Sequence, residues 1–372
     1  MRARATIDAG AVERNCARIA SELSPGTALC AVVKADGYGH GAVPCAAAAL
    51  AGGATWLAVA AASEAVQLRW ELAERTRILM MGALDVHDLD IALGAGADVA
   101  VWRSEFLETV AKQGRALGIR PQVHVKYDSG MGRLGERDPA AVTGLAREAA
   151  ASPDVDLVGF WTHFATADSE DTAFLHEQLE RFLAVAEPLK AEVGDLILHA
   201  ANSAATLREP RAHLDMVRCG VAIYGMDPLG RDPAEQRLEP ALTLSSYVAD
   251  VKRFEAGASA GYGRTWAAES DTCVGVLPIG YGDGVRRGLS NNADVLVGGR
   301  RYPLVGTVSM DNITIDLGPD TDVSPGDAAV LIGSQGEERI LAEEVAERLD
   351  TINYEVTCGI SPRVPRELAG AR

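Results

Sequence analysis

One pattern recurs roughly every 25–35 residues over the first part of the chain: a short apolar run, a polar or glycine-rich turn, and an amphipathic stretch rich in alanine and leucine. The runs that read as buried strands are Leu29–Val33, Trp56–Ala60, Ile78–Met81, Val99–Trp102, Val123–Tyr127, Leu157–Trp161, Leu196–His199 and Val217–Tyr224. Eight alternating strand and helix units predict a closed (β/α)8 barrel of the TIM type, with an open doubly wound sheet as the alternative. No G-x-G-x-x-G follows the first run, which weakens the alternative.

The pattern changes after Gly225. The segment Asp227–Pro240 is rich in proline, glycine and charge, and it reads as a boundary. Short β-type runs follow, at Ser246–Val251, Val274–Pro278, Val295–Val297, Ile313–Ile315 and Ala328–Ile332, with one helix expected over Ala342–Leu349. We therefore expect a barrel domain over residues 1–230 and a smaller, mostly β domain over residues 231–372.

Composition limits the partners of such a chain. It has 52 acidic and 35 basic residues, a net charge of −17, which argues against nucleic acid and anionic membranes. An anionic ligand must then be held by locally clustered cations. The N-terminal segment lacks the apolar core of a signal peptide, and no apolar run is long enough to span a bilayer. We expect a cytoplasmic protein without a metal site.

Lys34 lies where the first apolar run meets a glycine-rich turn, in the sequence AVVKADGYGHG. A lysine at the mouth of a buried strand is partly desolvated and can form a Schiff base with an aldehyde cofactor. The alternative is a structural lysine that extends to water. Other polar side chains follow later strands, at Lys126, Arg133, His163, Asn202, Ser203 and Arg218. Barrel chemistry collects at the carboxyl ends of strands, which favours the functional interpretation of Lys34.

These segments resemble those of the alanine racemases, and the resemblance spans roughly Ile7 to Arg366. It implies pyridoxal 5'-phosphate (PLP) as the cofactor, bound through Lys34. Arg218, in MVRCGVAIYG, is then the arginine that faces the pyridine nitrogen, and His163 lies against the cofactor ring. A guanidinium does not give up its proton, so the ring stays neutral. Without the resemblance, Arg218 would read as half of a structural ion pair, and His163 could equally be a core histidine or a residue of the site.

The resemblance also implies a phosphate site. Its members are Tyr38, Ser203, the backbone amides of Gly220 and Val221, and Tyr354 in the segment INYEVTCG. Hydroxyl and amide donors suit a phosphate. Ser203 could equally cap the helix that follows it.

The segment VKYDSGMGRLG resembles the family segment whose arginine meets the substrate carboxylate, which implies that role for Arg133. A planar guanidinium suits a carboxylate. Lys126 matches a lysine that is often carbamylated in the family. The alternative for Lys126 is a surface ion pair with Asp128. Two residues of the second domain match substrate-site positions: Tyr281, at the substrate entrance, and Met310, whose backbone N–H meets the carboxylate.

Racemisation needs a base on each face of a planar carbanion. The segment AGYGRTW resembles the family's second-base segment, which makes Tyr262 the second base, assisted by His163 and Arg218. The family's tyrosine reaches the site of the other subunit, so a homodimer with shared active sites is implied. The alternative is a turn tyrosine that caps a β-hairpin.

The resulting hypothesis is a PLP-dependent, two-base racemase that interconverts L-alanine and D-alanine and supplies D-alanine for peptidoglycan. Three alternatives remain: a racemase of broader or serine specificity, a PLP barrel amino-acid decarboxylase, and a PLP-carrying barrel without catalytic activity. Arg218 opposes the decarboxylase, because decarboxylation gains from a protonated pyridine. The second domain with Tyr262 opposes the carrier.

Overall fold

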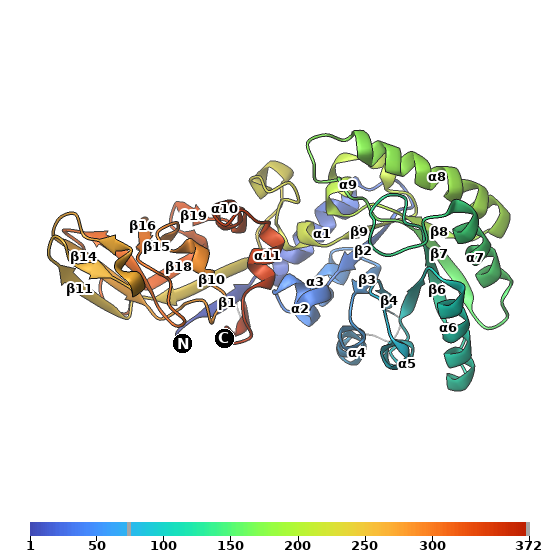
Figure 1. Cartoon of the computed structure of the whole chain (residues 1–372), viewed down its shortest axis with the longest axis horizontal. Coiled ribbons are helices and arrows are strands. Elements are labelled where there is room, and N and C mark those ends of the chain that lie inside the picture. The colour runs from blue at the N-terminus through green and yellow to red at the C-terminus, as the bar shows by residue number, and fades with distance from the viewer. Residues whose placement is uncertain (73–75, 370–372) are drawn as a thin grey trace. The chain divides into compact units, whose positions relative to one another are not determined.

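Eight parallel strands close into a barrel, which confirms the predicted (β/α)8 fold (Figure 1). The strands are β2 (Ala28–Val32), β3 (Trp56–Val59), β4 (Arg77–Met80), β5 (Asp98–Val101), β6 (Gln122–Lys126), β7 (Asp156–Trp161), β8 (Ile197–His199) and β9 (Met216–Cys219). The ring closes between β2 and β9, where Cys30 is paired with Arg218. Helices cover the outside of the ring, so most strand positions are buried and apolar.

The helices of this part are α1 (Ala9–Glu22), α2 (Lys34–Tyr38), α3 (Ala42–Ala51), α4 (Ala62–Glu71), α5 (Val86–Gly94), α6 (Ser104–Leu117), α7 (Pro139–Ala151), α8 (Ala173–Val193) and α9 (Ser203–Arg208). The start of α7 and the end of α6 follow ordinary capping chemistry. Asp138 caps α7 by accepting a hydrogen bond from the Ala141 N–H (2.7 Å), and Pro139 occupies the first helical position. Gly118 ends α6 in the left-handed conformation.

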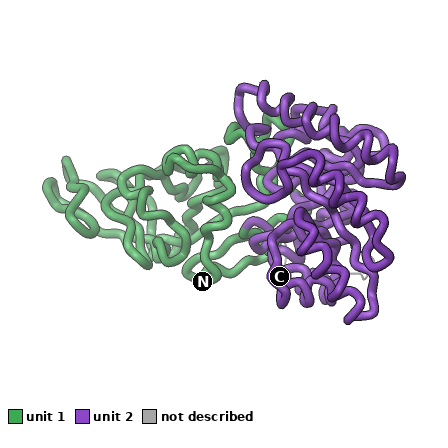
Figure 2. Tube along the Cα trace, turned by 45° about the vertical axis from the view of Figure 1, so that its right-hand side comes forward, with its two compact units in different colours: residues 1–11, 39–41, 224–372 green, residues 12–38, 42–223 purple. Residues whose placement is uncertain are grey.

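The computed structural model describes residues 1–72 and 76–369, which form two compact units (Figure 2). Unit 2, residues 12–38 and 42–223, contains the barrel. Unit 1 takes up residues 1–11 and 39–41 together with the chain from residue 224 onward. None of the described helices combines the length and the apolar character needed to cross a membrane.

Unit 1 is mostly β, as predicted, and its main sheet has the order β11-β14-β17-β16-β15-β18-β10-β1-β20, with β19 beside β18. The bounds are β1 (Arg4–Ile7), β10 (Leu242–Tyr247), β11 (Asp250–Phe254), β14 (Thr272–Leu277), β15 (Asp294–Val297), β16 (Arg300–Val305), β17 (Ile313–Gly318), β18 (Ala328–Gln335), β19 (Glu338–Ile340) and β20 (Arg366–Leu368). A two-stranded hairpin is formed by β12 (Ser259–Ala260) and β13 (Trp266–Ala267), and two helices follow β19, α10 (Ala342–Arg348) and α11 (Asn353–Cys358).

Two of the predicted runs do not form a single continuous strand. The run Val217–Tyr224 is divided, because the strand ends at Cys219 and residues 221–224 form a 3-10 turn. The chain turns at Gly220, whose N–H donates to the Ser203 hydroxyl (3.0 Å). The run Ser246–Val251 spans the end of β10 and the start of β11, because the chain passes from one strand to the next at Val248 and Ala249.

Candidate active site

The segment labelled α2 is not an ordinary α-helix but a left-handed turn, and it presents the candidate cofactor lysine. Directly after Lys34, four successive residues have φ between 51° and 62°: Ala35, Asp36, Gly37 and Tyr38. Residues other than glycine avoid this region at a cost of roughly 1 kcal/mol each. Side chains hold the turn in place: the Glu64 carboxylate accepts from the Ala35 N–H (2.6 Å), and Asp36 accepts from the Ala42 N–H (2.9 Å). The strain is thus maintained where Lys34 follows β2.

Arg218 is the polar centre of the barrel interior. Its guanidinium donates to the carbonyl oxygens of Thr162 (2.8 Å) and Ala200 (3.0 Å) and to Nδ1 of His199 (2.9 Å). Burial lowers its pKa to about 10, so it stays charged at neutral pH. Its Nε is buried and has no hydrogen-bond partner within the described parts of the chain. This N–H is a donor that an unprotonated pyridine nitrogen would satisfy.

A directed chain of hydrogen bonds extends from Arg218 across the barrel. His199 must accept at Nδ1, because a guanidinium only donates. Its Nε2 therefore carries the proton and donates to Nδ1 of His124 (3.0 Å), whose Nε2–H in turn donates to Asp98 (3.1 Å). Arg77 closes the chain on the same carboxylate (2.6 Å). Burial, and then the charge of Arg218, lowers the pKa of His199 well below its ordinary value.

The residues of this hydrogen-bond chain are not predicted from the sequence. Asp98, His124 and His199 stand inside apolar strands, and a buried polar residue in such a run is the only signal that the sequence offers. The strand register that makes them neighbours is not visible in the sequence.

The candidate phosphate donors of unit 2 meet at the start of α9. The Ser203 hydroxyl accepts from the Gly220 N–H (3.0 Å). A Cβ at Gly220 would lie only 2.3 Å from the Tyr38 hydroxyl, so the glycine leaves room for that oxygen. Val221 follows, fully buried. The cap of α9 is Asn202, which accepts from the Ala205 N–H (3.0 Å), so Ser203 is not the helix cap. Hydroxyls and a backbone N–H fit a phosphate.

Lys126 ends β6 among cations. It is only 3% exposed and lies over the ring of Trp161, 4.2 Å from its centroid. Burial, and then the charges of Arg218 and Arg133, lowers its pKa to about 7. The carboxylate of Asp128 instead holds the next loop, since it accepts from the N–H groups of residues 130, 131 and 132. Both residues are buried, so they do not form the surface ion pair of the alternative, although the charge of Asp128 raises the pKa of Lys126.

His163 is the acceptor on the other side of Arg218, at 3.2 Å between Nη2 and Nδ1. Burial lowers its pKa well below the ordinary value, and the charges of Arg218, Arg133, Lys126 and Lys34 lower it further. Lys34 and Arg133 therefore lie close enough to His163 for their charges to lower its pKa. Arg133 itself is exposed, on the loop that Asp128 holds.

The remaining candidate residues belong to unit 1. Three of them are large side chains left exposed: Tyr262 (73%), Met310 (52%) and Tyr281 (44%). Their segments adjoin, since the Thr307 hydroxyl donates to the Tyr262 carbonyl (2.7 Å) and the Tyr281 N–H donates to Ser309 (3.0 Å). We call these three residues the exposed face of unit 1. Tyr354 lies in α11 of the same unit, and its role stays a prediction.

The barrel fits PLP at three separate points: a lysine at its mouth, a guanidinium N–H to which no described residue is hydrogen-bonded, and a hydroxyl cluster. Unit 2 thus has the features of a PLP enzyme of the barrel class, and comparison with known proteins gives the family. The chain matches the N-terminal domain of alanine racemase over residues 7–228 and the C-terminal domain over residues 241–368. It belongs to the alanine racemase family, whose members are PLP-dependent isomerases.

Full-length relatives support this membership. The chain is 44% identical over 367 residues to an alanine racemase of Symbiobacterium thermophilum, covering 98% of this chain and 97% of the relative. The alanine racemase structure of Streptomyces coelicolor A3(2) is 38% identical with a TM-score of 0.94, covering 100% of this chain and 98% of that one. That of E. faecalis is 39% identical with a TM-score of 0.92, covering 99% and 98%.

Proposed function

We propose that the chain interconverts L-alanine and D-alanine with two bases on opposite faces of the substrate, Lys34 and Tyr262. Bound PLP withdraws electrons from the α-carbon and makes its hydrogen acidic. Lys34 Nζ removes and returns the α-proton of D-alanine, and the Tyr262 hydroxyl removes and returns the α-proton of L-alanine. The product D-alanine would serve peptidoglycan synthesis, and a cytoplasmic location stays a prediction.

The observation that carries this proposal is the state of Arg218. Its guanidinium donates to His199, two carbonyl oxygens and His163, and its Nε–H has no hydrogen-bond partner among residues 1–72 and 76–369. Such a group can hydrogen-bond a pyridine nitrogen without protonating it. With PLP bound, Arg218 would leave the pyridine ring neutral, which would favour return of a proton over decarboxylation or transamination.

Substrate binding is assigned to Arg133 and to the backbone N–H of Met310, both toward the carboxylate, with Tyr281 at the entrance. A charged fork and a backbone donor suit a carboxylate oxygen pair. His163, which takes a hydrogen bond from Arg218 through Nδ1, is the proposed link between that arginine and Tyr262. Tyr38, Ser203, Gly220, Val221 and Tyr354 would hold the phosphate.

We further propose that Lys126 carries a carbamate. A neutral amine reacts with CO2, and the lowered pKa of about 7 leaves much of Lys126 neutral at neutral pH. A nitrogen–carbon bond forms between the neutral amine and CO2, one proton is released, and Lys126 becomes an anion in the field of Arg133. A carbonyl carbon signal at Lys126 after incubation with 13C-bicarbonate, absent from Lys126→Met, is the expected result.

The proposed assembly is a homodimer in which Tyr262 serves the partner's barrel. A tyrosine that is 73% exposed contributes little to packing within its own unit, and Tyr281 and Met310 beside it are exposed as well. Grouped exposed apolar side chains commonly mark an interaction surface. We therefore propose that the Tyr262 hydroxyl of one subunit completes the active site in the barrel of the other subunit.

Subunit mixing tests this proposal. Lys34→Ala and Tyr262→Phe should each abolish racemisation, because each removes one base. Mixed dimers would have one site with both bases and one with neither. Random exchange makes about half of the dimers mixed, so about one quarter of the wild-type sites should reappear. No recovery after verified subunit exchange would exclude the shared site. Tyr262→Phe alone should still exchange the α-hydrogen of D-alanine with deuterated water.

A further inference from the structure

Two loops of unit 1 carry Tyr281 and Met310, and they are paired through their backbones. The N–H of Tyr281 donates to the Ser309 carbonyl (3.0 Å), and that of Gly282 donates to the Met310 carbonyl (2.9 Å). The approach is close: a Cβ at Gly280 would lie 2.2 Å from the Ser309 oxygen. A change in one loop is therefore transmitted to the other.

This pairing sets the direction of the Met310 N–H. In a trans peptide the C=O and the following N–H point in opposite directions. The Ser309 carbonyl points at Tyr281, so the Met310 N–H of the same peptide points away from the Tyr281 loop. The N–H that we assign to the substrate carboxylate keeps its orientation only while the two loops stay paired.

Asp283 holds the Tyr281 loop in shape from inside. Its side chain is 1% exposed, and its Oδ2 accepts from the Gly280 N–H (3.0 Å). Its own N–H donates to the Gly280 carbonyl (2.9 Å), and its carbonyl accepts from the Ser361 N–H (3.0 Å). The Ser361 hydroxyl donates to the Gly282 carbonyl (2.9 Å). Asp283 thus fixes the loop on both sides of Tyr281.

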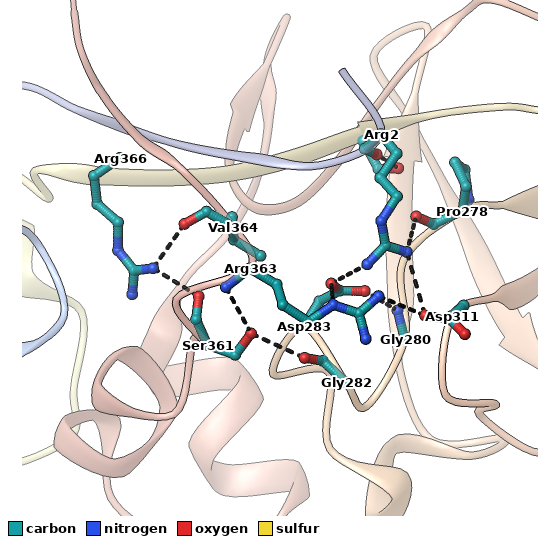
Figure 3. Close-up of polar contacts among 11 residues, drawn as sticks. Arg2, Pro278, Gly280, Gly282, Asp283, Asp311, Ser361, Arg363, Val364 and Arg366 are labelled. Atoms are coloured by element: carbon teal, nitrogen blue, oxygen red, sulfur yellow. Dashed lines mark hydrogen bonds and ion pairs between the residues drawn. The ribbon is translucent and has the colours of Figure 1, made fainter.

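Two arginines from the two ends of the chain hold the Asp283 carboxylate (Figure 3). Arg2 donates to Asp283 Oδ1 and to the Pro278 carbonyl (3.1 Å), and Arg363 Nε lies 3.5 Å from the same Oδ1. Arg363 also donates to Asp311 (2.6 Å), the residue after Met310. The arginines therefore connect the Asp283 loop with the Met310 loop by charge as well as through the backbone.

We propose that Asp283 is a positioning residue for substrate binding: held by Arg2 and Arg363, it keeps the Tyr281 and Met310 loops paired and the Met310 N–H directed at the substrate carboxylate. This inference rests on the proposed assignment of Tyr281 and Met310 to the substrate site. A buried carboxylate that only stabilised the fold would affect the midpoint of unfolding and leave the affinity for carboxylates unchanged.

The test is Asp283→Asn in the PLP-loaded, full-length protein. An amide no longer satisfies both the Gly280 N–H and the two guanidinium groups. The KM for alanine should rise roughly tenfold with little change in kcat, because a hydrogen bond to a charged group is lost equally from substrate and transition state. The inhibition constant of propionate, a carboxylate without an amino group, should rise by the same factor. Amide hydrogen exchange should accelerate in peptides covering residues 278–285 and 306–312.

Arg2→Ala is the second variant, since it removes one partner of Asp283 and leaves the turn intact. It should also raise the KM for alanine and the inhibition constant of propionate and accelerate amide exchange in the two loops, but by a smaller factor. The matched control is Asp316→Asn. Asp316 joins β17 to β14 by accepting from the Thr272 hydroxyl, so its loss should affect the unfolding midpoint but not KM, propionate inhibition or exchange in these loops.

Wild-type KM and propionate inhibition in both Asp283→Asn and Arg2→Ala would overturn the inference, whether or not the loops exchange faster. So would equal effects of Asp283→Asn and Asp316→Asn. These outcomes are independent of the subunit-mixing result, which uses neither Asp283 nor Arg2. A failure of the proposed two-base function would therefore be recognised separately.

Discussion

At the scale of single residues, the barrel contains two buried cations whose surroundings differ. Arg218 is 3% exposed and donates to carbonyl oxygens and to neutral imidazoles. Lys126, equally buried, lies over an aromatic ring in the field of Arg218 and Arg133. A guanidinium keeps its charge under such conditions, whereas an ammonium loses its proton readily. The two residues are therefore suited to different tasks, a fixed donor and a reactive amine.

The lowered pKa of Lys126 predicts how the free energy of unfolding depends on pH. In the folded protein its pKa is about 7, against an ordinary value of 10.5. Between these pH values the unfolded chain binds a proton at Lys126 that the folded chain lacks. The free energy of unfolding should therefore rise with pH in this window, by about 1.4 kcal/mol per pH unit from this residue. Below pH 7 the contribution is a constant penalty.

Urea unfolding of the cofactor-free protein in carbonate-free buffer, compared with Lys126→Met from pH 7 to pH 10, measures this slope. The wild-type protein should gain stability relative to the variant as the pH rises. Parallel curves across the window would show that Lys126 is protonated alike in both states. Adding bicarbonate should change the wild-type curve alone.

At the scale of elements, the hydrogen-bond chain that connects Arg218 with Asp98 depends on one position in β7. Gly159 is paired with His124, and a Cβ there would lie 2.2 Å from His124 Nδ1. Gly159→Ala should displace the imidazole, break its bond to His199 and lower the free energy of unfolding by roughly 1–3 kcal/mol. Nitrogen-15 spectra of the histidines should show Nε2–H tautomers for His124 and His199 in the wild type, and a changed His124 signal in the variant.

Gly144→Ala is the control for this prediction. Gly144 lies in the exposed middle of α7, and a Cβ there meets nothing within 4 Å. Alanine should stabilise the helix by roughly 0.5–1 kcal/mol and leave both histidine signals unchanged. Equal effects of the two substitutions would contradict the steric argument.

The elements also show what the sequence could and could not reveal. The barrel strands were predicted because they are buried on both faces, which leaves continuous apolar runs. The strands β1 and β20 were not, since RATI and REL are short and half polar. The left-handed turn after Lys34 was not predicted, because Ala35 and Asp36 give no sign of positive φ. Motifs indicated the site residues one at a time, whereas their grouping depends on strand register.

At the scale of the whole molecule, the N-terminal strand pairs with strands from the C-terminal part of the chain. The strand β1 lies inside the sheet of unit 1, antiparallel to β10 and parallel to β20. Ala5 and Ile7 are completely buried there. The N-terminal residues are thus part of the domain that is otherwise formed after residue 224. The network around Asp283 follows from the same topology, because Arg2 lies two residues before the start of this strand.

This topology predicts that a fragment of residues 224–372 does not fold cooperatively alone. Without β1, strand β10 loses its register of four residues from Leu242 to Ser245, and β20 loses the strand to which it is paired. Burial of Ile7 alone is worth roughly 1.5–3 kcal/mol, a large share of the stability of a small domain. A synthetic peptide of residues 1–11 should restore a single thermal transition and a dispersed amide spectrum. The same peptide with Ala5→Asp and Ile7→Asp should not, because both charges would enter the sheet's core. Residues 39–41 are missing from every arm, so the comparison isolates the strand. If the fragment melted cooperatively at the same temperature with and without the peptide, β1 would be an accessory to a sheet that forms without it.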